Sequence, residues 1–130
     1  GLPELNLGLI PGYGGTQRLT RLIGKAKATE MIIFSQPVAG QQAEQRGLVN
    51  KSVPREQLLT AAMEWAERIA RDRSAASVAA ALTAITEGLD GTLDEGLERE
   101  AELFGALFET ESMREGVTAF IEKRPAKFPD

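Results

Sequence analysis

The sequence contains no cysteine and no histidine among its 130 residues. Without cysteine, disulfide frameworks, thiolate nucleophiles and cysteine-based zinc sites are excluded. Without histidine, Ser–His catalysis and imidazole general bases are excluded as well. Any acid or base work within this chain therefore falls to Asp, Glu, Lys or Tyr13.

Long apolar runs and excess positive charge are also missing. No apolar run approaches the roughly 20 residues that a membrane span needs, and from these residues we expect no secretory leader. The net charge of −4 and the pI of about 5.0 disfavour a nucleic-acid partner. We therefore expect no membrane and no nucleic acid among the partners, and a cytoplasmic location. The hydrophobic share of 42% is that of an ordinary globular chain.

Most of the chain has the apolar spacing of helices joined by short loops. Helices are predicted from Thr16, over 26–34, for one or two turns within 40–47, and after Pro54. An Ala-rich helix ends near Gly91, and Thr92 with Glu95 forms a capping box for the next one. Ser112 with Glu115 predicts a further box, and Pro125 stops the last helix. Residues 48–53, LVNKSV, alternate apolar and polar and are the best strand candidate.

The first 15 residues combine glycines with a single acid, Glu4. The sequence matches neither common phosphate-binding motif. No glycine has Lys and Ser/Thr at P-loop spacing, and Gln17 stands where a dinucleotide-binding motif needs glycine. From the residues alone, the glycines fit a tight turn that enters a helix. Glu4 then fits a solvated surface acid. A strand-like opening without an earlier strand to pair with suggests that the chain is part of something longer.

Three stretches give a more specific interpretation: PELNLGLIPGYGGTQRLTRLIGKAKATEMI, AEQRGLVNKSVP and REGVTAFIEKRPAKF. Together they resemble the C-terminal half of the enoyl-CoA hydratase (crotonase) family, over essentially all 130 residues. The resemblance implies a mainly α fold, the C-terminal helical part of a crotonase-like α/β (ClpP/crotonase) fold with one or two short strands. Residues 1–53 would end the core, with the active-site wall, and residues 54–130 would form a helical assembly region.

The resemblance also implies a site. Glu4 matches the family glutamate that protonates the acyl α-carbon during reversible hydration of trans-2-enoyl-CoA to 3-hydroxyacyl-CoA. Gly12 matches the glycine whose N–H helps to position the water, and Leu7 is assigned to substrate binding with it. The family's other glutamate and both oxyanion-hole donors belong to its N-terminal half, and no GGG-x-E-like stretch replaces them here. We therefore expect the 130-residue chain alone to be inactive.

Near the other end, Phe104, Phe120 and Lys123 match positions that face coenzyme A in the family, partly across a subunit boundary. From the residues alone, both phenylalanines also fit simple core positions, and Lys123 fits a solvated cation at a helix end. No metal or redox cofactor is implied, since coenzyme A enters as part of the acyl-CoA thioester substrate. A homo-oligomer, a trimer or a dimer of trimers, is expected for the intact enzyme of fatty acid metabolism.

Two alternatives remain open at this point. Within the family, the reaction could be an isomerisation, a thioester hydrolysis or a decarboxylation, because one scaffold hosts several reactions. From another class, the chain could be a non-catalytic helical assembly module.

Overall fold

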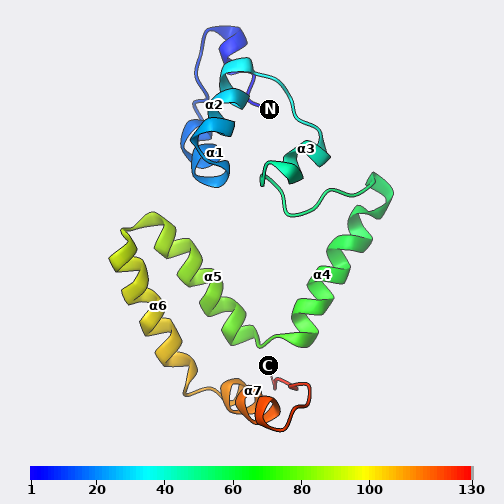
Figure 1. Cartoon of the computed structure of the whole chain (residues 1–130), viewed down its shortest axis with the longest axis vertical. Helices are drawn as coiled ribbons and strands as arrows, with labels where there is room; N and C mark the ends of the chain where they lie inside the picture. Colours follow the sequence, from blue (N-terminus) through cyan, green and yellow to red (C-terminus); the bar gives the residue numbers. More distant parts are fainter. Residues whose placement is uncertain (130) are drawn as a thin grey trace. The chain divides into compact units, whose positions relative to one another are not determined.

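The computed structural model describes residues 1–129, which form helices joined by loops (Figure 1). The α-helices are α1 (Gly15–Ile23), α2 (Lys25–Phe34), α3 (Gly40–Gln45), α4 (Leu58–Asp72), α5 (Ala75–Asp90), α6 (Leu93–Leu107) and α7 (Glu111–Ile121). Two 3-10 turns, η1 (Glu4–Leu7) and η2 (Arg55–Gln57), precede α1 and α4. The described residues contain no strand, so the mainly α prediction is confirmed and the expectation of one or two short strands is wrong for this part of the chain.

The chain divides into two compact units, one over Gly1–Ala61 and one from Ala62 onward. The division falls within α4, eight residues after the boundary that the sequence predicts between 53 and 54. The roles assigned to the two parts, core and assembly region, stay predictions. Each unit is described by itself below.

The core of the first unit forms where α1 and α2 pack together. Gly24 separates the two helices at a φ of 82°, as the break in the apolar pattern predicts. Leu19, Ala28 and Met31 are its buried members. Partly buried apolar side chains surround them, namely Leu2, Ile23, Ile32, Val38 and Leu48. Because Leu2 belongs to this set, the start of the chain is fixed against α1 and α2.

The predicted strand over residues 48–53 is a loop instead. Its N–H groups find partners on α3: Leu48 donates to the Ala43 carbonyl (2.8 Å), and Ser52 donates to a carboxylate oxygen of Glu44 (2.8 Å). A strand is stable only beside another strand, and the described residues offer none. Residues 48–53 are therefore a loop that α3 holds through two hydrogen bonds.

In the second unit, α5 and α6 form an antiparallel hairpin (Figure 1). The predicted capping box is confirmed, since the Thr92 hydroxyl accepts from the Glu95 N–H (3.3 Å) and the Thr92 N–H donates to the Glu95 carboxylate (2.8 Å). Near this end the two backbones meet. A Cβ added to Gly96 would lie 3.3 Å from the Cα of Gly88. Glycines thus set the spacing of the two helices.

Helix α7 begins two residues earlier than the sequence predicts. Thr110 is its N-cap, with its hydroxyl accepting from the Met113 N–H (3.1 Å). The predicted capping box of Ser112 and Glu115 is therefore wrong. Ser112 lies inside the helix and is buried, and Glu115 binds Arg124 instead. Thr110 can cap the helix in place of Ser112 because it offers the same kind of hydroxyl acceptor.

Apolar side chains remain exposed along several helices. Among residues 1–129 the buried apolar side chains are Pro11, Leu19, Ala28, Met31, Ala43 and Ala119. The stripes that predicted the later helices, including Leu58, Ile69, Leu82, Ile85 and Leu97, lie on open helix faces. The spacing of these residues predicts helices correctly, but the described residues do not cover the faces that they form.

Candidate functional site

Glu4 opens the 3-10 turn η1 and is half-buried. The turn is held by its backbone, since the N–H of Gly8 donates to the Leu5 carbonyl (3.1 Å) and the N–H of Leu9 donates to the Glu4 carbonyl (3.1 Å). The side-chain Oε2 of Glu4 is buried and has no hydrogen-bond partner among the described residues. Buried polar atoms in folded proteins are almost always paired, so an oxygen without a partner indicates a place for a ligand or water. Glu4 is therefore only partly a solvated surface acid, since one of its two carboxylate oxygens is shielded from solvent.

The glycine-rich turn joins this acid to the N-terminus of α1. Gly14 caps the helix at a φ of 76°, a conformation that L side chains rarely adopt. Gly15 sits at a close approach, because a Cβ there would lie 2.9 Å from Pro11 and 3.2 Å from Leu2. The bare backbone therefore lets the segment that carries Glu4 pack on the helix. The tight-turn interpretation of these glycines is confirmed.

Gly12 lies exposed in this turn, and the nearest atom to a Cβ built there is the Ile10 carbonyl oxygen at 3.9 Å. Its backbone is open to an approaching molecule. Its neighbour Tyr13 is 90% exposed; Arg18 lies over the Tyr13 ring at 5.5 Å and donates to the Tyr13 carbonyl. No side chain in the described residues closes the space over Gly12.

Leu7 is 76% exposed at the end of η1. It does not line a hollow of about 300 Å³ in the first unit, which is bounded mainly by Leu2, Leu19, Leu22 and Met31. Glu4 and Gly12 do not line this hollow either. Glu4 and Leu7 lie on η1 and Gly12 lies in the turn that follows, and the assignment of all three to the substrate site stays a prediction.

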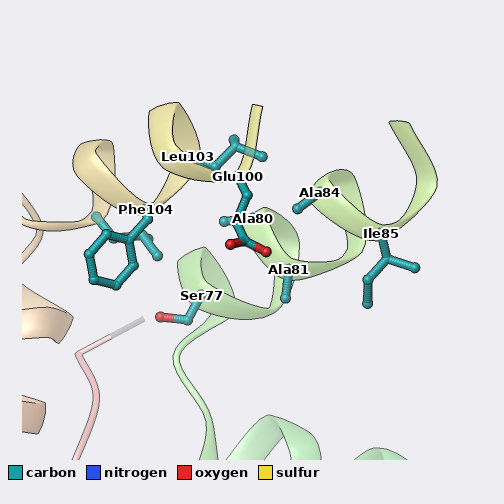
Figure 2. A pocket seen from close by; sticks show the side chains of 9 residues that line it. Ser77, Ala80, Ala81, Ala84, Ile85, Glu100, Leu103 and Phe104 are labelled. Atoms are coloured by element: carbon teal, nitrogen blue, oxygen red, sulfur yellow. The ribbon is translucent and has the colours of Figure 1, made fainter. Parts of the chain in front are cut away.

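Phe104 lies on α6 beside a hollow of about 270 Å³ between α5 and α6. Figure 2 shows its ring at one end of this hollow and Ile85 at the other, with the small side chains of Ala80, Ala81 and Ala84 between them. Phe104 stacks edge-on against Phe108, with ring centroids 5.1 Å apart. It is 63% exposed, so it is not a core residue of this unit.

Phe120 and Lys123 lie at the end of α7. Phe120 is 84% exposed, which excludes the core position that its apolar spacing also allows. Lys123 follows the helix with a φ of 55° and has no ion-pair partner among the described residues. An aromatic face and a free cation thus stand one helical turn apart. Both lie in the second unit with Phe104, whereas Glu4, Leu7 and Gly12 lie in the first.

The sequence did not reveal an ion-pair cluster around α7. Arg124 binds Glu115 (2.6 Å) and Glu122 (2.6 Å), and Glu115 also accepts the N–H of Lys127 (2.8 Å). The hydrogen bond from Arg124 is the main cause that lowers the pKa of Glu115 to about 2, with the Lys127 N–H next. The available signal was a Glu in the first turn of the predicted helix and an Arg at its last position before Pro125.

Residues 1–129 lack two further kinds of feature. No group of three or more acidic side chains is arranged to hold a metal ion. No helix is long and apolar enough to cross a membrane.

Comparison with known proteins places these features in a family. Residues 1–130 match the family described as enoyl-CoA hydratase/isomerase. The chain is 47% identical over 124 residues to a protein named "Probable enoyl-CoA hydratase, mitochondrial" from Dictyostelium discoideum, covering 95% of this chain and 44% of that protein. It is 44% identical over 128 residues to the mitochondrial enoyl-CoA hydratase of Pongo abelii, covering 98% and 44%.

A solved structure agrees with these relatives. The crystal structure of an enoyl-CoA hydratase from Geobacillus kaustophilus superimposes with a TM-score of 0.89 at 37% identity, covering 99% of this chain and 48% of that one. The chain thus spans about half the length of the proteins that it matches.

Proposed function

Because residues 1–130 belong to the enoyl-CoA hydratase/isomerase (crotonase) family and correspond to its C-terminal half, we propose that the protein hydrates trans-2-enoyl-CoA reversibly to 3-hydroxyacyl-CoA. One observation carries the proposal: the carboxylate at the family's acid position, Glu4, has a buried oxygen without a partner. A general acid or base must have an oxygen free to reach the reacting proton. Glu4 meets that requirement.

In this proposal Glu4 acts on the α-carbon. The oxygen of water would bond to the β-carbon and give one of its protons to the companion glutamate of the family pattern, while the C=C electron pair would take a proton from the carboxyl group of Glu4 at the α-carbon. Dehydration runs the same steps backwards, so the ionised carboxylate removes that proton. The turn η1 fixes the backbone of Glu4, which limits where its carboxyl group can lie.

The glycine-rich turn supplies the second contact. The open N–H of Gly12 would orient the water, and the N-terminus of α1 would favour negative charge that develops nearby. Leu7 is exposed beside Glu4 on the same 3-10 turn and would contact the acyl chain. This surface offers a proton donor and one water contact.

Polarisation of the thioester carbonyl needs groups that these residues do not supply. In the family pattern, two backbone N–H groups and a companion glutamate come from the N-terminal half, whose motif the 130 residues lack. Residues 1–130 would therefore contribute one wall of the site. Phe104, Phe120 and Lys123 would contact the coenzyme A part of the substrate, so no separate cofactor is proposed.

Assembly into a homo-oligomer, a trimer or a dimer of trimers, is part of the same proposal. Its support is the set of large apolar side chains that the described residues leave exposed on α4, α5 and α6. A cytoplasmic location is proposed with it.

The isomerase reaction named in the family description is the main alternative, and isotope incorporation separates the two. The complete gene product is incubated in D₂O with crotonyl-CoA and, separately, with a 3-enoyl-CoA. Hydration gives 3-hydroxybutyryl-CoA with one deuterium at the α-carbon, measured by mass spectrometry. Conversion of the 3-enoyl-CoA to the 2-enoyl-CoA without a hydroxylated product would overturn the hydratase proposal in favour of isomerisation.

A further inference from the structure

Helix α7 ends in a Schellman motif whose left-handed residue is a lysine. The N–H of Lys123 donates to the Phe120 carbonyl (3.2 Å), and the N–H of Arg124 donates to the Ala119 carbonyl (3.0 Å). Lys123 has a φ of 55°, in the left-handed region. Glycine is the usual residue at this position, because a Cβ makes the conformation unfavourable.

Hydrogen bonds tie down the chain on both sides of Lys123. Arg124 forms a forked pair with Glu115, with nitrogen–oxygen distances of 2.6 and 3.0 Å, and its Nε donates to Glu122 at 2.6 Å. Glu115 also accepts the N–H of Lys127 at 2.8 Å. Glu115 therefore joins the body of α7 to the residues after its end. A forked arginine–carboxylate pair restricts both orientation and distance, more than a single contact does.

The ammonium of Lys123 takes no part in these ion pairs within residues 1–129. A left-handed residue that is not glycine persists only where its surroundings hold it, and such residues concentrate at functional sites. If the turn served only to end the helix, glycine would do so with less strain. A lysine at this strained position therefore points to a role for its side chain.

We infer that Glu115 is a positioning residue for coenzyme A binding: through Arg124 and the Lys127 N–H it holds the turn that places the Lys123 ammonium. The anion that Lys123 meets is a phosphate of the nucleotide part of coenzyme A. The exposed ring of Phe120, one turn earlier, offers an apolar surface beside it. This inference rests on the proposed function, since it takes the substrate to be a coenzyme A thioester.

The test compares two thioesters in the complete gene product. Crotonyl-CoA carries the nucleotide phosphates, whereas crotonyl-pantetheine lacks them. For Glu115→Gln we expect KM for crotonyl-CoA to rise about tenfold, the effect of one weakened charge contact, with kcat unchanged. The constants for crotonyl-pantetheine stay as they were. Lys123→Gly gives the same rise in KM without a lower thermal midpoint, because glycine relieves the left-handed strain.

Glu98→Gln is the matched control, because Glu98 is exposed on α6 and forms no ion pair among the described residues. Equal losses of Glu115→Gln on both thioesters, or an unchanged KM for either variant, overturn the inference. If the unsubstituted protein does not hydrate crotonyl-CoA, the proposed function fails, and calorimetric titration with coenzyme A decides the inference. Weaker binding by both variants than by Glu98→Gln then supports it, and equal or absent binding overturns it.

Discussion

The structure leaves no room for a side chain at position 15, which is a glycine. A Cβ at this position would lie 2.9 Å from the Cβ of Pro11, and Pro11 is itself buried. We expect Gly15→Ala to destabilise the fold by about 1–3 kcal/mol, because the first segment and α1 must move apart. Urea unfolding followed by circular dichroism measures the change.

Gly105→Ala is the control for this substitution. Gly105 lies in α6, and a Cβ there meets nothing within 4 Å. Alanine is favoured over glycine inside a helix by about 1 kcal/mol, so this variant should be as stable as the original or more so. Equal destabilisation by both substitutions would mean that close packing at Gly15 is not the cause.

Glu4 is the residue on which the proposed chemistry depends. In the complete gene product, Glu4→Gln should lower kcat for crotonyl-CoA hydration by at least ~10²-fold, the low end of what a general acid contributes. The amide keeps the shape of the carboxyl group but cannot give or take the proton. Steady-state kinetics beside Glu98→Gln provide the measurement. Near-normal hydration by the Glu4 variant would remove Glu4 from the mechanism.

The sequence predicted these residues with uneven success. Glu4 and the glycines were identified through a motif resemblance. The structure adds the unpaired oxygen of Glu4 and the close packing at Gly15, which the sequence alone does not show. The left-handed Lys123 could not be predicted, because lysine gives no signal for that conformation and glycine is the usual one. The pair of Glu115 and Arg124 spans nine positions across a helix end, so helical spacing did not reveal it.

At the scale of one element, α7 should respond to acid through Glu115. Its pKa is lowered from an ordinary 4.5 to about 2 in the folded chain, so the unfolded chain binds more protons between these values. The contribution of Glu115 to stability is therefore fully present above about pH 4.5 and is lost as the pH falls toward 2. Urea unfolding at a series of pH values should show a steeper acid loss for the original chain than for Glu115→Gln.

Other carboxyl groups also titrate in this range, so the comparison needs its own control. Glu98→Gln should keep the steep pH dependence of the original chain. If Glu115→Gln and the original lose stability in parallel, the ion pair with Arg124 does not act on stability in solution.

Helices were predictable because their apolar spacing is local, whereas the strand was not. The alternation over residues 48–53 is incomplete, since Leu48 and Val49 are both apolar and residues 50–52 are all polar. A strand also depends on hydrogen bonds to a distant partner. Here Ala43 and Glu44 of α3 take those N–H groups. The start of α7 shifted by two residues because Thr110 and Ser112 offer equivalent hydroxyls, and the sequence alone does not rank them.

For the whole molecule, the exposed apolar faces predict self-association of the 130-residue chain. Large side chains such as Leu59, Leu89 and Phe120 are more than 70% exposed, and exposed apolar surface of this kind promotes contact between chains. Size-exclusion chromatography with light scattering at micromolar concentration measures the mass. A monomer that also binds no hydrophobic dye would contradict this expectation.

Activity of the 130-residue chain alone is a separate matter. Loss of one oxyanion-hole donor costs about 10²–10³ in kcat, and both donors and the companion glutamate belong to the motif that this sequence lacks. We expect no hydration of crotonyl-CoA above background by residues 1–130, and recovery when a matching N-terminal half is supplied. Rapid turnover by the 130-residue chain would refute the interpretation of these residues as one wall of the site.

In the hairpin of α5 and α6, the residues that set the distance between the helices differ from the residues that line the hollow. Its spacing is set where Gly88 meets Gly96, while the hollow beside Phe104 is lined by alanines nearer the start of α5. Substitutions of the alanines can therefore reshape the hollow while the glycines keep the helices in register. During evolution, such a frame can exchange the lining of one face repeatedly without first having to rebuild the hairpin that carries it.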